Sequence, residues 1–455
     1  MKSLLKSSLV LLIWQAVALQ AATTVTNIAA GDFHSLFLQS NGSLWVMGQN
    51  TYGGLGDGTY NDTNRPEQII SGGVKAIAGG LAHSLFVKSD GSLWGVGMDN
   101  FGQLGDGKSS TTTNQPQQIL SNGVVAVACG SYHSLFLKSD NSLWAMGNNA
   151  MGQLGDGKNT SSTNRPEQIV SGNVVAIAGG SYYSLFLKSD GSLWAMGDNQ
   201  YGQLGDGPTV NNTNRPQQIV SGGVVAIACG DNHSLFLKSD GSLWAMGRNN
   251  YGQLGDGTLS NANLPELIVP NGVTAISAGT QHSLFIKSDG SLWGMGWNLL
   301  NQLGDGIFLT SPNRPEQILS SGAVAIAAGT YHSLFLKSDG SLWGMGSDGY
   351  GQLGDGFAHT STNSESLRPL QIVPTPLPVL GGRISSETNL QFTATCGFGG
   401  FFYLLTSSNL AQPRNQWIPV WTNSIDTRSN NNFNVTLSNA VNSLIGRQFF
   451  ILQSP

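Results

Sequence analysis

Charged residues are scarce in this 455-residue chain, at 10% of the sequence against about 25% in an average protein. The formal net charge is -5, so the sequence offers no broad basic surface of the kind that binds nucleic acid or an anionic membrane. Because the hydrophobic fraction is still 40%, the composition is not that of a disordered chain. We therefore expect a folded protein that does not bind nucleic acid.

Cysteine is also rare, with three residues, which is too few for a disulfide framework. Cys129 and Cys229 occupy equivalent positions of the repeat described below, two units apart, and Cys396 lies outside it. Equivalent positions two units apart in a ring exceed the ~7 Å Cα limit for a disulfide. No two cysteines are close enough in sequence to suggest zinc. We expect buried free cysteines, no metal and no cofactor.

Long hydrophobic runs are missing except at the N-terminus. Lys2 and Lys6 precede an apolar segment at 9–17, and Ala21-Ala22 follow it, which is the order of a secretory signal peptide. The apolar run is shorter than the ~20 residues of a spanning helix. We expect residues 1–21 to be a signal peptide and the mature chain to be secreted or held at the cell surface, with no membrane span. A membrane anchor is the alternative.

Glycine, by contrast, is abundant, with 61 residues, and much of it falls in a repeat of about 50 residues. The string His-Ser-Leu-Phe recurs seven times, with one substitution by tyrosine, and its first residues are His34, His83, His133, Tyr183, His233, His282 and His332. Ser-Leu-Trp, Leu-Gly-Asp-Gly and a proline before a short apolar run follow in each copy. The repeat extends from about Val25 to Val373.

Each repeat has the pattern of four short strands. In the unit from Gly222 to Val269, a β-branched run, an apolar hairpin through Gly241 and a run that starts at Pro265 follow one another. Seven such units predict an all-β, seven-bladed β-propeller over residues 22–373. A linear solenoid is less favoured, because the first and last copies are not atypical caps. We expect the strand at 25–28 to lie close to the strand at 369–373, which closes the ring.

The repeat ends before the C-terminus. Residues 374–378 form a Pro-rich linker, and residues 379–455 keep β-rich runs without the repeat. This last segment resembles a terminal β-sandwich module of exported bacterial repeat proteins. We expect a small β-sandwich-like C-terminal module.

The unit Gly230–Gly257 resembles the repeat of the regulator of chromosome condensation family. The resemblance implies the propeller fold. The founding member is a nuclear exchange factor for a small GTPase and binds chromatin, but we expect an exported acidic chain to have no small-GTPase partner and no exchange activity. In its setting the chain is more similar to secreted bacterial members such as the propeller-type β-lactamase inhibitor, which implies a protein-binding propeller.

Residues that recur in every copy favour structural roles. Neighbouring histidines of a propeller lie too far apart to share a metal ion, so we expect them to form hydrogen bonds at strand starts. The Leu-Gly-Asp-Gly aspartates lack the ligand pattern of an EF-hand and resemble turn residues. The tryptophans alternate within an apolar hairpin and are expected in the core. Because no nucleophile set is unique to one copy, we expect no enzymatic activity.

Residues that differ between copies are the candidates for recognition. The two residues directly before the histidine differ from repeat to repeat, and so does one residue after the tryptophan hairpin. Aromatic and charged residues occur at these three positions. The predicted binding rim consists of Phe33, Tyr132, Tyr182, Asp231, Arg248, Trp297 and Tyr331. Such residues suit a protein or glycan partner, so we interpret the chain as an exported, non-catalytic scaffold for an extracellular protein or glycan. The alternatives are a secreted enzyme inhibitor, a purely structural envelope protein, or loop variation without a ligand.

Overall fold

The computed structural model describes residues 24–108, 112–158, 161–207, 211–306, 311–356 and 365–373, and six strands between 381 and 453. The chain divides into two units, one of which, Val25–Val373, contains the repeats. The predicted signal peptide and Pro-rich linker lie outside the described residues. No helix in the described part is long and apolar enough to cross a membrane.

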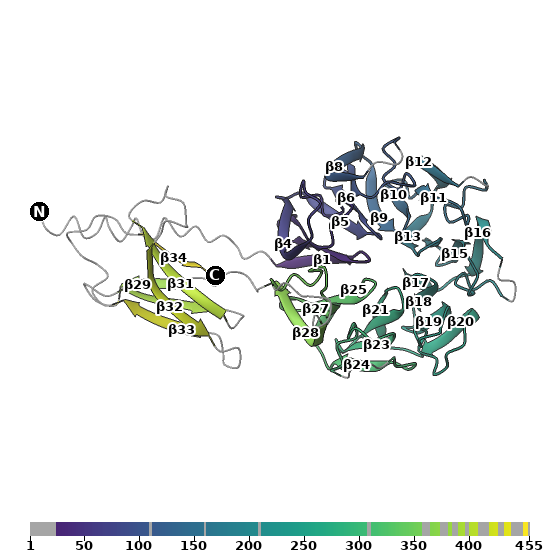
Figure 1. Cartoon of the computed structure of the whole chain (residues 1–455). Coiled ribbons are helices and arrows are strands. Elements are labelled where there is room, and N and C mark those ends of the chain that lie inside the picture. Colours follow the sequence, from purple (N-terminus) through teal and green to yellow (C-terminus); the bar gives the residue numbers. More distant parts are fainter. Residues whose placement is uncertain are drawn as a thin grey trace, which may run out of the picture. The chain divides into compact units, whose positions relative to one another are not determined.

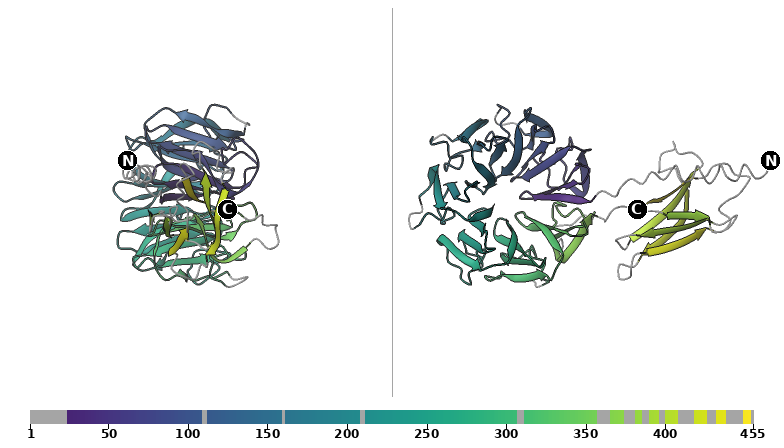
Figure 2. Two further views of the ribbon diagram at one scale, coloured as in Figure 1. Left: turned by 90° about the vertical axis from the view of Figure 1, so that its left-hand side faces the viewer. Right: turned by 180° about the vertical axis from the view of Figure 1, so that it is seen from behind.

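Seven four-stranded antiparallel sheets surround the axis of the repeat unit, each formed by four consecutive strands (Figures 1 and 2). The first strands are β1 (Val25–Ala30), β5 (Val74–Gly79), β9 (Val124–Cys129), β13 (Val174–Gly179), β17 (Val224–Cys229), β21 (Val273–Ala278) and β25 (Ala323–Ala328). The second strands are β2 (His34–Gln39), β6 (His83–Lys88), β10 (His133–Lys138), β14 (Tyr183–Lys188), β18 (His233–Lys238), β22 (His282–Lys287) and β26 (His332–Lys337). The third strands are β3 (Leu44–Gly48), β7 (Leu93–Gly97), β11 (Leu143–Asn148), β15 (Leu193–Gly197), β19 (Leu243–Gly247), β23 (Leu292–Gly296) and β27 (Leu342–Ser347). The fourth strands are β4 (Thr63–Ile70), β8 (Thr113–Leu120), β12 (Ser162–Val170), β16 (Thr213–Val220), β20 (Ala262–Val269), β24 (Glu316–Leu319) and β28 (Glu365–Val373).

The described residues contain no helix, and the predicted all-β, seven-bladed propeller is confirmed. We number the blades 1 to 7 from β1–β4 to β25–β28. First strands of neighbouring blades contact one another round the whole ring, including β25 and β1. These strands are therefore innermost, and they line the central channel.

Turn chemistry explains the hairpin between the second and third strands. Gly241 joins β18 to β19 with a φ of 79°, which glycine adopts without steric cost. In blade 3 the same place is taken by Asn141 at 62°, and asparagine is among the residues that tolerate this conformation. The fourth strand begins earlier than predicted, since β20 starts at Ala262 and contains Pro265 in its interior. It pairs only with β19, so the missing proline N–H removes no bond from a central ladder.

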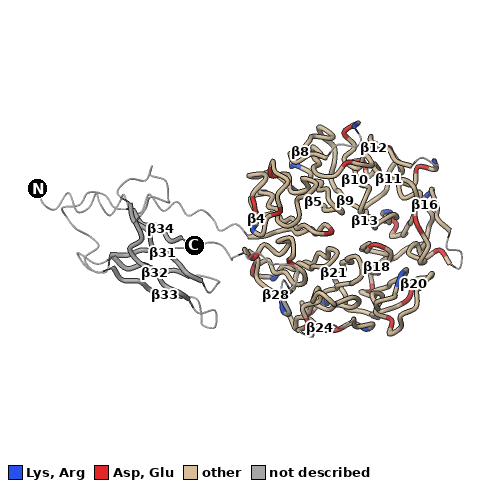
Figure 3. The backbone as a smooth tube through the Cα atoms, viewed as in Figure 1, with Lys and Arg blue, Asp and Glu red and all other residues tan. Residues whose placement is uncertain are grey.

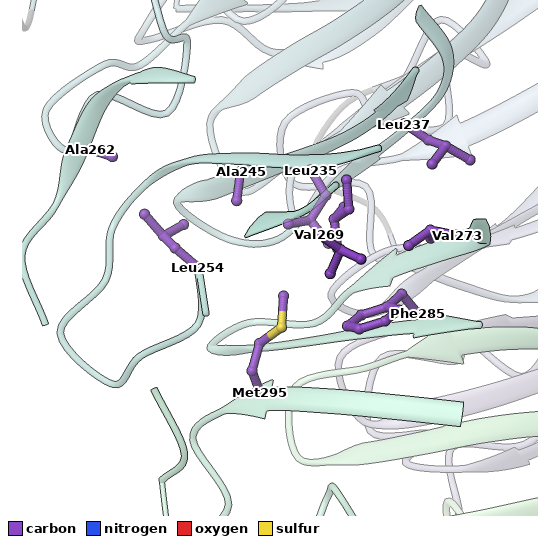
Figure 4. Close-up of a cluster of buried hydrophobic side chains, with 10 residues drawn as sticks. Leu235, Leu237, Ala245, Leu254, Ala262, Val269, Val273, Phe285 and Met295 are labelled. Carbon is purple, nitrogen blue, oxygen red and sulfur yellow. The ribbon is translucent and has the colours of Figure 1, made fainter. Parts of the chain in front are cut away.

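Hydrophobic clusters lie between blades rather than within them. In one of them Leu235 and Leu237 of blade 5 pack with Phe285 and Met295 of blade 6 (Figure 4). In the cluster that closes the ring, Leu334 and Leu336 of blade 7 and Phe37 and Met47 of blade 1 take the equivalent places.

The two ends of the repeat unit meet in this closing cluster. Val25 of β1 and Ile372 of β28 both belong to it, as the sequence predicted for these strands. They are members of different blades, however, because each blade is formed by one continuous segment.

The described strands of the other unit form two three-stranded sheets. One contains β29 (Gly381–Ile384), β30 (Leu390–Thr395) and β33 (Asn432–Leu437), and the other contains β32 (Ile418–Ile425), β31 (Gly400–Ser407) and β34 (Phe449–Gln453). This segment is therefore β-rich, as predicted.

Candidate functional site

The recurring histidines link neighbouring blades. His133 Nε2 lies 2.8 Å from Ser184 Oγ of the next blade, and that hydroxyl donates to the carbonyl oxygen of Gln153, 2.8 Å away, in the blade of the histidine. Because the serine proton is used in this bond, the histidine carries its proton on Nε2 and donates it to the serine. We call this arrangement the latch. The other histidine–serine pairs are His34–Ser84, His83–Ser134, His233–Ser283, His282–Ser333 and the ring-closing His332–Ser35.

Tyr183 takes the place of histidine in blade 4. Its hydroxyl donates to the carbonyl oxygen of His233 and lies 3.1 Å from Ser234 Oγ. The tyrosine thus also connects its blade to the next one. Because the latch forms bonds between blades at every junction, the prediction of a structural role for these positions is confirmed.

Burial keeps the latch histidines neutral. It lowers the pKa from 6.5 to about 4 for His34 and to about 3 for His83, His133, His233, His282 and His332. No group of three or more potential metal ligands occurs among the described residues. The two described cysteines are free, and burial raises the pKa of the Cys229 thiol to about 12, so it does not ionise near neutral pH.

The other recurring residues are also bound internally. Asp156 Oδ1 accepts bonds from Asn149 Nδ2 at 3.0 Å and from the Lys158 backbone N–H at 2.9 Å, which confirms the turn role. Trp144 donates from Nε1 to Ser142 Oγ and stacks on Phe136 at 6.1 Å. The repeat tryptophans pack against the clusters between blades, which confirms their packing role. They are half-buried rather than fully buried, because the phenylalanines fill the core and the indole rings cover them.

The residues of the predicted rim come together at one end of the channel. Tyr132 stacks on Tyr182 with 5.3 Å between the ring centroids. Tyr331 lies 5.7 Å from Phe33 and 5.1 Å from Trp297. These contacts join residues of adjacent blades, so the aromatic side chains form two groups on the same face.

A further loop position extends this aromatic rim, and sequence reasoning missed it. It lies three residues before the leucine of Leu-Gly-Asp-Gly, and it is aromatic in five repeats, as Tyr52, Phe101, Tyr201, Tyr251 and Tyr350. Phe101 contacts Tyr132 at 5.4 Å, and Tyr350 contacts Phe33 at 5.5 Å. The recurrence of an aromatic residue outside the strands was the signal that could have identified it.

Arg248 is the one basic residue of the predicted rim. Its guanidinium carbon lies 5.1 Å from the ring centroid of Tyr201 and 6.0 Å from that of Tyr251. Such stacking is favourable because the ring face attracts a cation. The charge of Arg248 also lowers the pKa of Asp231.

The mouth of the channel lies inside this rim. Two residues before the latch position, the repeats carry Asp32, Leu81, Ser131, Ser181, Asp231, Thr280 and Thr330, which we call the mouth residues. Four of them, Asp32, Ser131, Asp231 and Thr280, line the cavity at the axis. Thr280 Oγ1 lies 2.9 Å from Thr330 Oγ1, and these two hydroxyls lower the pKa of Asp231 and of Asp32 respectively. A cavity of about 120 Å³ opens between them, lined mostly by glycine and other small residues of the first-strand ends.

Glycine just before the mouth position is required by close packing. A Cβ atom at Gly130 would lie 2.2 Å from His133 Cε1 and 2.3 Å from the carbonyl oxygen of Gly180. Equivalent glycines occur in all seven repeats. These glycines allow the first strands to approach the axis closely. Because glycine has no side chain, the chemistry of the channel mouth depends on the mouth residues.

Two carboxyls give the mouth an acidic character, and only Asp231 belonged to the predicted set. Burial and the charge of Asp231 raise the pKa of Asp32 to about 8, against the lowering effect of the Thr330 hydroxyl. Burial raises the pKa of Asp231 to about 6, against the lowering effects of Thr280 and Arg248. Elsewhere on the ring, acidic and basic residues are dispersed (Figure 3).

A closed seven-bladed ring of RCC1-type repeats, with variable loops at one face, defines the class of this protein. The RCC1-like domain profile matches residues 11–223, and profiles of the regulator of chromosome condensation (RCC1) repeat match residues 224–253, 273–302 and 323–352, and also 240–286 and 289–336. The chain belongs to the RCC1 repeat family.

Solved structures share this fold. Human WBSCR16 is 23% identical, with a TM-score of 0.64 over 73% of this chain and 94% of its own. Prp20p from Saccharomyces cerevisiae is 23% identical, with a TM-score of 0.60 over 70% of this chain and 84% of its own. The yeast RCC1 (Prp20) chain solved with Kap60 is 25% identical, with a TM-score of 0.60 over 67% of this chain and 78% of its own. Among curated protein sequences none matches this chain significantly.

These comparisons correct the partner prediction. We expected an extracellular protein or glycan, and neither nucleic acid nor a small GTPase. Prp20p, which has the same fold, is described as binding Gsp1p, a small GTPase, and histones. The exclusion was wrong because it rested on net charge and on the expected export. A propeller binds through a few loop residues, and the composition of the whole chain does not determine what those residues recognise.

Proposed function

We propose that this chain is a protein-binding scaffold that recognises its partner through the aromatic rim and the channel mouth, without catalysis. Propellers of this family generally bind proteins. The rim concentrates tyrosine, tryptophan and arginine, the residues that dominate binding energy in protein interfaces. The single observation that carries the proposal is the set of aromatic contacts that joins rim residues of adjacent blades.

The residues that stabilise the ring differ from those that we propose for recognition, which supports this role. The latch and the clusters between blades hold the ring together with recurring residues. The rim residues are half-buried, and neighbouring rings hold them in place. A pre-organised aromatic surface loses less conformational entropy when it binds a partner.

We also propose that the scaffold acts outside the cytoplasm, secreted or held at the cell surface. The order of charged, apolar and small residues in 1–21 supports export. The C-terminal segment would then be a β-sandwich-like module, which its two three-stranded sheets allow.

Capture of partners by the purified protein tests the proposal. The bait variant is Tyr132→Ala/Tyr182→Ala, which removes one of the two aromatic groups. The matched control is Val175→Ala/Val225→Ala. These two exposed side chains lie on first strands of adjacent blades, at the end of each strand that is far from the rim. Capture lost in the tyrosine variant and kept in the valine variant supports the proposal. Equal capture by both variants and the unchanged protein contradicts it.

Binding of a small GTPase is the second candidate. The observation that favours it is the match to the RCC1-like domain together with the fold shared with Prp20p, which binds Gsp1p. The test is release of a fluorescent guanine nucleotide from a purified small GTPase in the presence of this chain. Accelerated nucleotide release would identify the chain as an exchange factor and contradict the proposal of a non-catalytic scaffold. Unchanged release would contradict exchange activity and leave the scaffold proposal in place.

A further inference from the structure

The guanidinium group of Arg248 contacts aromatic rings but forms no ion pair with the described residues. Its central carbon lies 5.1 Å from the ring centroid of Tyr201 in blade 4 and 6.0 Å from that of Tyr251 in blade 5. The ion pairs of the described chain do not include Arg248, and its Nε atom is buried without a hydrogen-bond partner. The chain thus holds a half-buried cation whose hydrogen-bonding capacity is not used internally.

In other blades the same position serves the fold. Asn148 Oδ1 of blade 3 accepts a bond of 2.8 Å from Gln153 Nε2, and blade 4 has the equivalent bond, also of 2.8 Å. An arginine side chain has no acceptor atom. In blade 5 the corresponding amide, Gln253 Nε2, is therefore buried without a partner, as it is in blades 2, 6 and 7. Arg248 costs its loop a hydrogen bond that asparagine would form, so loop stability does not explain it.

Hydrogen bonds hold the two tyrosines that contact Arg248. The backbone N–H of Tyr201 donates to Gln203 Oε1 at 2.9 Å, and that of Tyr251 donates to Gln253 Oε1 at 3.0 Å. A guanidinium stacks through its faces and donates hydrogen bonds from its edge. Contact with two rings therefore leaves the N–H groups at the edge of the Arg248 guanidinium available to an acceptor.

We propose that Arg248 binds the carboxylate of an acidic side chain on the partner protein, with an adjacent apolar side chain of the partner packed on Trp297. This inference rests on the proposed function and names the chemistry of the partner. The occupant is a carboxylate because its two oxygens match two N–H groups of a guanidinium in parallel hydrogen bonds. The apolar neighbour follows from Trp297, whose ring lies 6.3 Å from Tyr251 and is half-buried.

The rings make this cation more effective than a freely solvated one. Tyr201 and Tyr251 exclude water from the faces of the guanidinium, and an ion pair is stronger where less water surrounds it. They also hold the side chain in place, so less conformational entropy is lost when the carboxylate binds. Both effects concern the complex and not the free protein.

The test uses the full chain at pH 7 and two peptides, Gly-Glu-Leu-Gly and its neutral analogue Gly-Gln-Leu-Gly. Each peptide carries an uncharged dye at its N-terminus and an amide at its C-terminus, so fluorescence anisotropy reports the affinity. The variant is Arg248→Asn, which carries the residue of blade 3 and can accept the bond from Gln253. The control is Arg215→Gln, which removes an exposed positive charge from β16 in blade 4.

We expect the glutamate peptide to bind the unchanged protein and Arg215→Gln equally, and Arg248→Asn at least about fivefold more weakly. The glutamine peptide should bind the unchanged protein as weakly as the glutamate peptide binds Arg248→Asn. The urea midpoint of Arg248→Asn should not fall below that of the unchanged protein. Equal binding of the two peptides, unchanged affinity in Arg248→Asn, or a lower urea midpoint for this variant would overturn the inference.

The outcome is separate from that of the proposed function. If the peptide test fails while capture of partners still depends on Tyr132 and Tyr182, the protein-binding face stays in place and Arg248 does not bind a carboxylate of the partner.

Discussion

The latch and the mouth lie two residues apart in each repeat, and their sequences behave differently. The latch position is histidine in six repeats and tyrosine in one, whereas the mouth position is aspartate, leucine, serine or threonine. The latch residue is buried and bonded to the next blade, while four of the seven mouth residues line the cavity at the axis. In this ring, a position that contacts the next blade in the same way at every junction is uniform, and a position that faces the open axis is free to differ.

The two regions also respond to acid with opposite signs. Burial depresses the pKa of six latch histidines, so the unfolded chain takes up their protons below about pH 6.5 and the folded chain does not. Each histidine therefore stabilises the fold fully above pH 6.5 and loses this contribution towards pH 3 to 4, at about 1.4 kcal/mol per pH unit. Asp32 and Asp231 have raised pKa values, so their folded forms hold protons that the unfolded chain has released, and they favour the fold as the pH falls.

The largest expected effect is acid destabilisation made steeper by removal of the mouth carboxyls. From pH 7 to pH 5 we expect the free energy of unfolding to fall by several kcal/mol, because six histidines outnumber the buried aspartates. In Asp32→Ser/Asp231→Ser the fall should be larger, since the opposing contribution is gone. Urea denaturation at pH 7, 6 and 5 measures both. If the free energy of unfolding does not change with pH, or if the variant has the same pH dependence as the unchanged protein, the histidines and the mouth carboxyls do not respond to acid with opposite signs.

Adjacent residues give the next largest contrast. His133→Ala should lower the free energy of unfolding by about 3 kcal/mol, because it opens a cavity and leaves Ser184 without its donor. Tyr132→Ala should cost about 1 kcal/mol or less, because that side chain is half-buried and contacts only the rim. Thermal unfolding of the two variants at pH 7 compares them directly. Similar losses at both positions would show that the rim also carries the stability of the ring.

The smallest effect concerns the one irregular latch. Tyr183→His restores the residue of the other six blades, and its imidazole would reach Ser234 as His133 reaches Ser184. The substitution exchanges one connection between blades for another, so we expect stability to stay within about 1 kcal/mol. A shift of the urea midpoint by much more would mean that tyrosine at this position fits blade 4 in a way that histidine does not.

Much of the fold was predictable because the repeat states the same information seven times. The motifs His-Ser-Leu-Phe and Ser-Leu-Trp predicted the positions of the second and third strands. Their seven regularly spaced copies predicted seven blades. The start of β20 was misplaced because Pro265 was taken as a boundary, although an outermost strand accepts proline in its interior. The partial exposure of the tryptophans was missed because alternating apolar and polar residues show which residues share a face of a strand. The alternation does not show how deeply each face is buried.

The site was less predictable, for physical reasons. Arg248 and Asp231 were selected separately, but the effect of the Arg248 charge on the pKa of Asp231 depends on how blade 5 places its two loops. Asp32 was passed over because the pKa of its carboxyl is raised by burial and by the charge of Asp231, which is about 200 residues away in the sequence. The raised pKa values come from burial around the axis, and a linear pattern does not show burial.

One consequence follows from the way the ring is closed. In this propeller no blade borrows a strand from the other end of the chain, because β1–β4 and β25–β28 are each continuous segments. The junction between blades 7 and 1 uses the same side-chain cluster and the same histidine–serine pair as the other junctions. The packing of the blades therefore does not require the chain to begin at blade 1 and end at blade 7. A gene that joins 373 to 25 and opens the chain at another junction should encode the same ring, so new termini can be placed beside any blade chosen for fusion.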